Sequence, residues 1–280
     1  MVNETVVVGI TEASAARRAA AWATDRAADR RDRLALVAVV GGALGVVGEG
    51  PILEAGMRRA AELLEQQAVR ARERGVVVAT RVVRGDPVAR LVEASRAGAL
   101  LVIGSDYRGP DSGPRRGPHG IRIAAGAHCP VAVVPDIDLS ARSGIVVGVD
   151  GSEASEAAVV FAAAEADRRG EPLTAVSAWT PLPLPLDMRD YPGEYLENMQ
   201  RLTEEAAAIS LAGLRQEYPD LELRRVVERG FPEVVIRRLA LGACMTVIGS
   251  HGRGPLGRFL LGSVSQLVLE HLATTTVVVR

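Results

Sequence analysis

Short apolar runs alternate with longer amphipathic segments along the whole chain. In the second half, five runs rich in β-branched residues cover 145–149, 172–179, 221–228, 244–249 and 275–279. Segments with the apolar spacing of a helix lie between them, at 153–169, 194–218, 232–241 and 262–272. This alternation predicts a parallel sheet with helices on both faces. Ligands of such sheets bind outside the carboxyl ends of the strands, where strand order reverses.

The helix expected at 194–218 carries a regular apolar stripe. Its members are Leu196, Met199, Leu202, Ala206, Ile209 and Leu214. Because these positions share one side of a helix, we expect the stripe to face the core.

The two halves of the chain repeat one another. Segment 6–23 matches 145–162, with Gly9 and Gly148 at equivalent positions. Three further matches follow in the same order, 84–87 with 229–232, 102–105 with 247–250, and 131–134 with 276–279. Matched blocks in one order predict two copies of one domain, at 1–138 and 143–280, joined by a polar linker.

Composition excludes several classes of function. The chain has 280 residues, of which 48% are hydrophobic and 24% charged, as in a globular protein with a sizeable core. The net charge of −1 and the aromatic content of 3% argue against a basic surface or an aromatic stacking platform for nucleic acid. All 33 basic residues are arginine, so no Walker A or Schiff-base lysine exists. Any bound phosphate must be held by backbone amides, hydroxyls, arginine or a metal.

The chain carries no recognisable signal for export or membrane insertion. The start of the sequence has no basic region, and the apolar stretch 34–48 is too short for a bilayer and is interrupted by Gly41, Gly42 and Gly45. We interpret that stretch as a buried strand that runs into a loop. Cys129 and Cys244 lack metal-ligand spacing and are expected to be buried free thiols. A cytoplasmic protein is expected.

One rim of the second sheet gathers candidate ligand-binding residues. Asp150 follows the first strand and suits a ribose hydroxyl or a phosphate-bound Mg²⁺. Gly249 and Gly252 follow the fourth strand, whose last apolar residue is Ile248, and let the backbone approach a ligand. Gly262 and Ser263 then open a helix, whose free amides favour an anion. Arg253 and Arg258, in the loop between, are candidates to neutralise phosphate.

Each of these residues also has a plainer interpretation. Gly249 or Gly252 alone would mark a turn, and the stretch from Asp150 to Ser152 is also suited to cap the helix that follows. His251 is more typical of a loop residue than of a general base, because no triad partner is apparent. Trp179 is suited to packing or to covering an adenine, and packing is favoured.

The combination is far more specific than its parts. The spacing Gly249-x2-Gly252-x9-Gly262-Ser263, after a strand and with Asp150 on the first strand, resembles the ATP-binding signature of the universal stress protein family. The resemblance covers both halves and is to the tandem, actinobacterial type. It implies Rossmann-like domains of the adenine nucleotide alpha hydrolase-like kind, each a five-stranded parallel sheet of order 3-2-1-4-5.

The resemblance also implies a ligand and its contacts. ATP, with Mg²⁺ a candidate companion held through Asp150, would bind mainly in the second domain. Adenine would lie near the Ala178 backbone and ribose near Asp150. The complete set of expected binding residues is Asp150, Ala178, Ile248, Gly249, His251, Gly252, Arg253, Gly262, Ser263 and Val264.

The first domain departs from this motif. Thr11 and Glu12 stand where the second domain has Asp150 and Gly151, and Tyr107 stands for Gly252. The glycine–serine pair is replaced by Gly117 and Pro118, and proline has neither hydroxyl nor amide proton. We expect weak ATP binding there and a structural role, with a changed ligand as the alternative.

Two functions of different classes follow. The first is an ATP-binding regulator of stress response or dormancy without dedicated catalysis, since we find no base, nucleophile or acceptor site beside the cradle. The second is a slow ATPase, or a nucleotidyl- or phosphate-transfer enzyme, that uses Asp150, Mg²⁺ and His251. A protein partner of unknown identity is expected, but no nucleic acid or membrane. The β-branched segments 131–134 and 276–279 suit pairing between the two domains, and a homodimer remains open.

Overall fold

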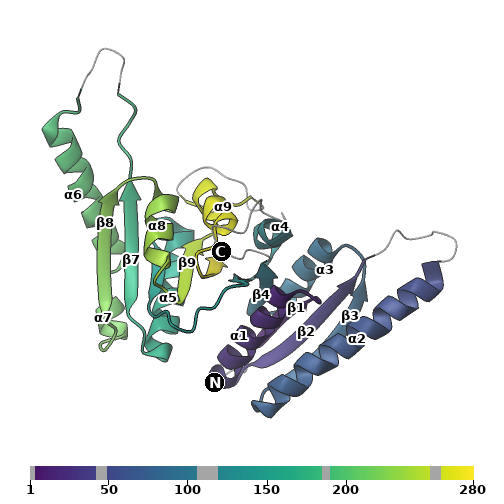
Figure 1. Ribbon diagram of the computed structural model, residues 1–280. Helices are drawn as coiled ribbons and strands as arrows, with labels where there is room; N and C mark the ends of the chain where they lie inside the picture. Colours follow the sequence, from purple (N-terminus) through teal and green to yellow (C-terminus); the bar gives the residue numbers. More distant parts are fainter. Residues whose placement is uncertain (1–3, 42–48, 106–118, 185–189, 253–259) are drawn as a thin grey trace. The chain divides into compact units, whose positions relative to one another are not determined.

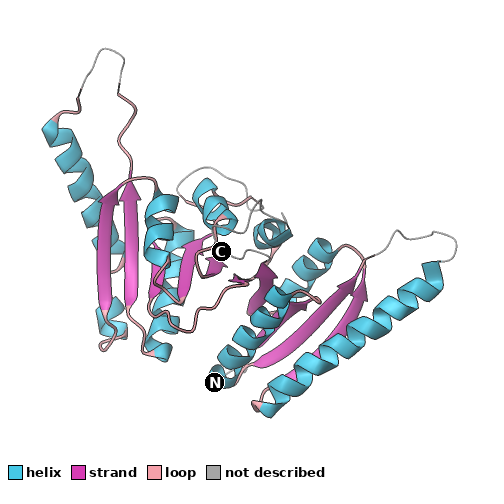
Figure 2. Ribbon diagram, in the orientation of Figure 1, coloured by secondary structure: helices cyan, strands magenta, loops and turns pink. Residues whose placement is uncertain are grey.

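The chain forms two compact units in the computed structural model, 1–137 and 138–280. The structure describes residues 4–41, 49–105, 119–184, 190–252 and 260–280. Each unit alternates strands and helices from its first element to its last (Figures 1 and 2).

Five strands lie in the described part of the N-terminal unit. They are β1 (Thr5–Ile10), β2 (Arg33–Val40), β3 (Val77–Arg84), β4 (Leu100–Ser105) and β5 (Val131–Pro135). The helical segments described between them are α1 (Ser14–Arg30), α2 (Glu49–Glu73), α3 (Pro87–Ala94), the short 3-10 helix η1 (Ser95–Ala97) and α4 (His119–Gly126). The strand expected within 34–48 is β2, whereas residues 42–48 lie outside the described part of the chain.

The C-terminal unit repeats this order. Its strands are β6 (Ile145–Gly148), β7 (Leu173–Trp179), β8 (Leu223–Arg229), β9 (Met245–Gly249) and β10 (Thr275–Val279). Its described helices are α5 (Glu153–Arg169), α6 (Gly193–Ser210), α7 (Leu214–Glu217), α8 (Pro232–Ala240) and α9 (Ser263–Glu270).

Strand order is the same in both units. The N-terminal strands lie in the order β3-β2-β1-β4-β5, and the C-terminal strands in the order β8-β7-β6-β9-β10. Every pairing within a unit is parallel. The α/β class and the order 3-2-1-4-5 are therefore confirmed. Strand order reverses beside β1 in one unit and beside β6 in the other, so the carboxyl ends of β6 and β9 meet at the reversal.

Helices cover both faces of each sheet because right-handed crossovers change face where strand order reverses. In the N-terminal unit, α1 packs on β1, β4 and β5, and α2 packs on β2 and β3. Helices α3 and α4 contact one another and cover the opposite face (Figure 1). The central strands are buried on both sides, and residues such as Val8, Leu101 and Ile145 have no exposed surface.

The structure corrects the inward stripe expected on 194–218. That segment is two helices, α6 and α7, with Gly213 between them in the left-handed region at φ +88°. Leu202 and Ile209 are 53% and 76% exposed, so the predicted core face is wrong at these positions. The buried residues are Ala207, Leu211 and Leu214. The helical periodicity of apolar residues could not show by itself which face of the segment is buried, because both faces carry apolar residues.

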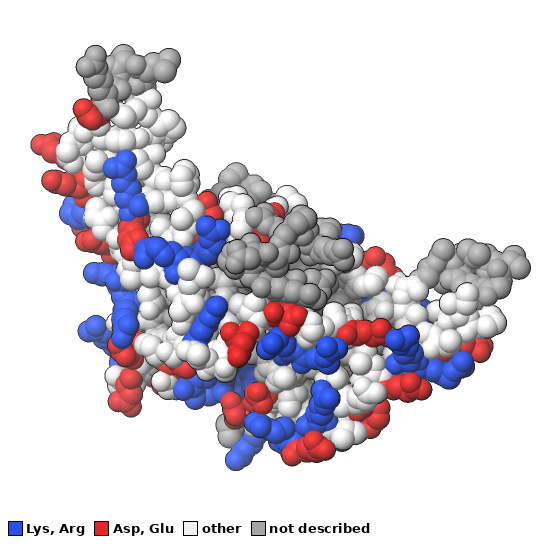
Figure 3. Space-filling model, in the orientation of Figure 1, with Lys and Arg blue, Asp and Glu red and all other residues white. Residues whose placement is uncertain are grey.

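Surface charge is mixed rather than segregated. Basic and acidic side chains alternate across the face drawn in Figure 3, and many of them form ion pairs, such as Arg201 with Glu205 at 2.7 Å. In the described part of the chain, every helix is too short or too polar to span a bilayer.

Candidate functional site

Asp150 lies in a tight turn between β6 and α5. Its Oδ1 accepts hydrogen bonds from the Ser152 amide at 2.9 Å and the Ser152 hydroxyl at 2.6 Å. Ser152 Oγ in turn accepts from the Ser155 amide at 3.2 Å and caps α5. Gly151 adopts φ +75°, a conformation that side chains with a Cβ rarely adopt. Ser152 therefore caps the helix, and Asp150 is held at its start with its carboxylate exposed.

The loop after β9 returns to this carboxylate. A Cβ built on Gly252 would lie 2.6 Å from Asp150 Oδ2. The Ser152 hydroxyl also lies 3.3 Å from the His251 carbonyl oxygen. The carboxyl ends of β6 and β9 thus place Asp150 against the bare Cα of Gly252, although about a hundred residues separate the two in sequence.

Gly249 has a different environment from Gly252. A Cβ on Gly249 would meet the backbone of Ala154 at 2.8 Å and the Ser155 nitrogen at 3.0 Å. This glycine therefore lets the first turn of α5 pack directly on the end of β9. Gly104 in the N-terminal unit is in the same position against Ala15, at 2.5 Å. The first glycine of the motif is thus required by the fold, whatever else it does.

His251 is oriented by its neighbour in sequence. Ser250 has no exposed surface, and its Oγ lies 2.6 Å from His251 Nδ1. The Ser250 amide donates to the Val279 carbonyl at 2.6 Å, which ties the loop to β10. The imidazole consequently has one nitrogen engaged with a buried hydroxyl at the rim of the sheet.

Gly262 brings the start of α9 to the same loop. Its amide donates to the Ser250 carbonyl at 2.8 Å, and a Cβ here would lie 3.4 Å from His251 Cα. Gly262 is the N-cap of α9 and lacks a side chain to cap the helix. The amides of Ser263 and Val264 in the first turn have no intrahelical carbonyl to donate to, as at every helix start. They form the positive end of α9 beside Gly252.

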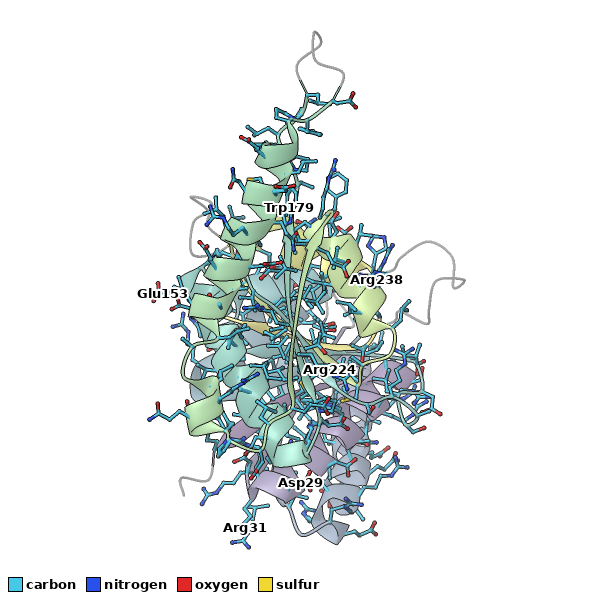
Figure 4. All side chains as sticks on the ribbon, turned by 90° about the vertical axis from the view of Figure 1, so that its left-hand side faces the viewer. Asp29, Arg31, Glu153, Trp179, Arg224 and Arg238 are labelled. Atoms are coloured by element: carbon cyan, nitrogen blue, oxygen red, sulfur yellow. The ribbon has the colours of Figure 1, made fainter. Side chains whose placement is uncertain are left out.

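The residue expected to lie near adenine, Ala178, is on β7. Ala178 pairs with Glu228 of β8 near the carboxyl end of its strand, and Ile248, on β9, is buried at 3% exposure. The side chain of Trp179 is 7% exposed, and its Nε1 donates to Gln200 Oε1 of α6 at 2.6 Å (Figure 4). Trp179 therefore packs between strand and helix, which is the favoured of its two sequence interpretations.

Part of the expected site falls on residues that the structure leaves undescribed. Arg253 and Arg258 lie outside the described residues, as do Tyr107, Gly117 and Pro118 of the N-terminal unit. Among the described residues, no cluster of three histidine, cysteine or acidic side chains is arranged to hold a metal ion. Asp150 is the acidic residue that the structure places beside Gly252 and the start of α9.

The N-terminal unit replaces the Asp150 turn with other contacts. Thr11 Oγ1 accepts a long hydrogen bond of 3.3 Å from the Ala13 amide, and Ala13 caps α1 without a side-chain hydrogen bond. Glu12, at the position of Gly151, forms an ion pair of 2.5 Å with Arg59 of α2. An ion-paired acidic side chain therefore stands where the C-terminal unit has a bare glycine.

Three serines complete the arrangement in ways that the motif does not reveal. Ser250 contacts His251, and Ser152 links Asp150 to the His251 carbonyl. The Ser265 hydroxyl donates to the Gly249 carbonyl at 2.7 Å and fastens α9 to β9. The sequence shows only their proximity to the glycines, since the carbonyl that each hydroxyl reaches depends on the loop path.

Comparison with known proteins gives consistent matches over both units. The model of the universal stress protein family matches residues 3–135 and 142–280. The universal stress protein Rv2623 of Mycobacterium tuberculosis is 31% identical over 98% of this chain and 96% of its own length. Rv2005c, a second such protein of that organism, is 34% identical with the same coverage.

A solved structure agrees in fold. The crystal structure of a universal stress protein from Archaeoglobus fulgidus matches with a TM-score of 0.74, covering 100% of this chain and 99% of that one. Sequence identity there is 17%, so this match speaks for the arrangement of strands and helices alone.

Proposed function

Because this chain belongs to the universal stress protein family, we propose that its C-terminal unit binds ATP and that the bound state regulates a protein partner in stress response or dormancy. Adenine would lie at the Ala178 backbone and ribose at Asp150. The phosphates would follow the loop and the start of α9, along Gly249, Gly252, Gly262, Ser263 and the Val264 amide. Ile248, His251 and Arg253 complete the proposed set of nucleotide-binding residues. Mg²⁺, carried in with the nucleotide, would have Asp150 as its ligand from the chain.

The observation that carries this proposal is the contact between Asp150 and Gly252. Asp150 Oδ2 lies 2.6 Å from the position of a Cβ on Gly252, so the backbone is bare beside an exposed acidic group. Among the described residues, no core contact explains Gly252, because it is exposed and a Cβ there would meet the side chain of Asp150. A polyphosphate ligand with a ribose needs both features, namely amides that it can reach and an acceptor for its hydroxyls.

The N-terminal unit supports the assignment by contrast. It keeps the glycine required for packing, Gly104, but has Glu12 paired with Arg59 at the turn. The Glu12 side chain and its arginine partner occupy the position that Gly151 leaves without a side chain. We therefore propose that ATP binds mainly in the C-terminal unit.

The direct test is calorimetric titration of ATP into the full chain and two glycine variants. Gly252→Glu fills the cradle with a negative side chain, and we expect ATP affinity to fall at least a hundredfold. Gly242→Glu is the matched control, because nothing lies within 4 Å of the Cβ position there. Equal ATP affinity in the wild type and Gly252→Glu would refute the site. Parallel titrations with ADP, AMP and cyclic AMP would identify the preferred nucleotide.

Slow phosphoryl transfer is the second candidate, and the oriented His251 imidazole at the same rim favours it. The discriminating experiment measures ADP release with and without Mg²⁺. Mg²⁺-dependent release that is lost in Asp150→Ala, while ATP binding is retained, would assign an enzyme. Binding without turnover would assign a regulator, whose nucleotide acts by favouring one conformation over another.

We also propose that β5 and β10 take part in pairing. Each is the last strand in the order of its own unit, and such β-branched edge strands invite a partner strand. Pairing within the chain, or between two chains in a homodimer, would satisfy them. Light scattering on the purified chain distinguishes a monomer from a dimer.

A further inference from the structure

The N-terminal unit has a groove on the sheet face that α3 covers. Its volume is about 800 Å³, within the range of small-molecule sites. The floor comes from one face of three adjacent strands, with Val7, Ala35, Val37, Ala79, Arg81 and Val83 among its residues. Helix α3 and η1 form the wall. The groove runs along the strands. Its lining includes none of the residues proposed to bind the nucleotide.

Small side chains keep this groove open. Ala35 and Ala79 are adjacent on the floor, and Ala94 and Ala97 form the facing wall. Strand registers place Thr174 and Arg224 of the C-terminal unit at the positions of Ala35 and Ala79. Counted from the prolines that begin α3 and α8, Leu239 stands at the position of Ala94.

An ion pair also crosses the equivalent place in the C-terminal unit. Arg238 of α8 lies 2.5 Å from Glu228 of β8. Arg224 and Arg238 project from β8 and α8 respectively (Figure 4). The C-terminal unit therefore has larger or charged side chains where the N-terminal unit has alanines, so the small lining residues are a property of this sequence rather than of the architecture.

The charges that line the groove are unbalanced. Arg90 is compensated, since it pairs with Glu93 at 2.8 Å and its Nε donates to the Arg84 carbonyl. Arg81 projects from the floor and Arg84 ends β3, and both are exposed. Among the described residues, neither of these two guanidinium groups has an ion-pair partner. The groove thus combines an alanine- and valine-lined body with uncompensated positive charge on its β3 side.

We propose that this groove binds a medium-chain carboxylate, with its acyl chain on the alanine floor and its anionic head at Arg81 and Arg84. Guanidinium groups bind carboxylates through two parallel hydrogen bonds. From Ala79 to Val83 the strand rises about 13 Å, which is room for an extended chain rather than a compact ring. The apolar floor gives affinity by burying the chain, and the arginines select the anion.

Titration of decanoate into the full chain tests the proposal, with decanol as the uncharged ligand of equal length. We expect saturable decanoate binding in the wild type and at least tenfold weaker binding in Ala94→Leu, which introduces the residue of the other unit. Leu239→Ala, the reverse change at the matched position, should leave decanoate affinity unchanged. Gly252→Glu should also bind decanoate normally, which separates this site from the nucleotide proposal.

Arg81→Glu is the second variant, because this exposed edge residue can change charge without disturbing the core. It should remove the preference for decanoate over decanol even if Ala94→Leu fails to fold. Equal decanoate affinity in the wild type and Arg81→Glu, or uptake that never saturates, would overturn the proposal. So would a stable dimer that binds no decanoate, because a second copy would then be the occupant.

Discussion

Gly249 and Gly252, three positions apart in one motif, meet different physical demands. The Cα of Gly249 faces the backbone of α5, where a methyl group would overlap Ala154. The Cα of Gly252 faces the carboxylate of Asp150 at an exposed rim. The packing of α5 accounts for the first glycine, whereas no core contact of the described residues accounts for the second. This distinction is why Gly252, and not Gly249, is the informative position for testing nucleotide binding.

Cys244 is a residue whose surroundings change its acidity. Burial raises the pKa of the Cys244 thiol above its ordinary value of 9.0, and the nearby Glu171 carboxylate raises it further. The Sγ atom donates to the Gly144 carbonyl at 3.2 Å. The thiol is therefore kept protonated, and thiolate chemistry at neutral pH is suppressed.

A pH dependence follows for Cys244. Above pH 9 the unfolded chain loses the thiol proton before the folded chain does, so the folded state binds more protons there. The stability that this thiol contributes is complete below pH 9 and declines as pH rises through the raised pKa. In a Cys129→Ala background, we expect iodoacetamide to alkylate the native thiol with a pH midpoint above 9.0. A midpoint at or below that value would contradict the assignment.

At the scale of elements, α6 shows how a helix can carry two apolar faces and bury only one. Ala207 and Leu211 face the core, whereas Ile209, between them in sequence, is 76% exposed. The chain then turns at Gly213, and α7 returns Leu214 to the interior. Contact with β7 and β8 sets the helix rotation, so the buried positions follow from packing rather than from the stripe.

Two alanine substitutions separate the faces of this segment. Leu211→Ala empties a buried site and should lower the free energy of unfolding by about 2–4 kcal/mol. Ile209→Ala, two residues away, removes an exposed side chain and should change it by less than about 0.5 kcal/mol. Urea unfolding of both variants measures the difference. Equal losses would mean that the stripe including Ile209 is buried after all.

At the scale of the whole molecule, one fold is built twice and specialised differently. Both units place a glycine at the end of the fourth strand, Gly104 or Gly249, where the first helix of the unit packs against it. Both have the same strand order. They differ at the rim of the sheet, where Asp150 and Gly151 of one unit stand for Thr11 and Glu12 of the other. They also differ on the α3 or α8 face, where larger side chains match the alanines of the groove.

This duplication predicts that matched glycine substitutions act on separate units. A methyl group at Gly104 or Gly249 would overlap helix backbone, which cannot move as a side chain can, and should cost about 1–3 kcal/mol. Hydrogen exchange should rise in peptides of 4–105 for Gly104→Ala and of 138–252 for Gly249→Ala. Gly104→Ala should leave ATP binding unchanged. An equal rise in both units would show that their stability is shared.

Much of this protein is readable from its sequence. Alternating runs of apolar residues determined the strands, because a strand buried on both faces must be apolar throughout. The internal repeat determined the duplication, and strand β6 was placed before Asp150 by pattern alone. The glycine spacing indicated a loop suited to approach a ligand, although not which of its glycines the fold itself requires.

Tertiary structure decided what depends on contacts between distant segments. It brought Asp150 against Gly252, set Ser250 against His251, and chose the inward face of α6. It also opened the groove beside α3, where single alanines are unremarkable in sequence and matter only as neighbours. Sequence periodicity fixes which residues share a face, whereas the neighbour that each face meets is set by how the strands are ordered and how closely the helices pack upon them.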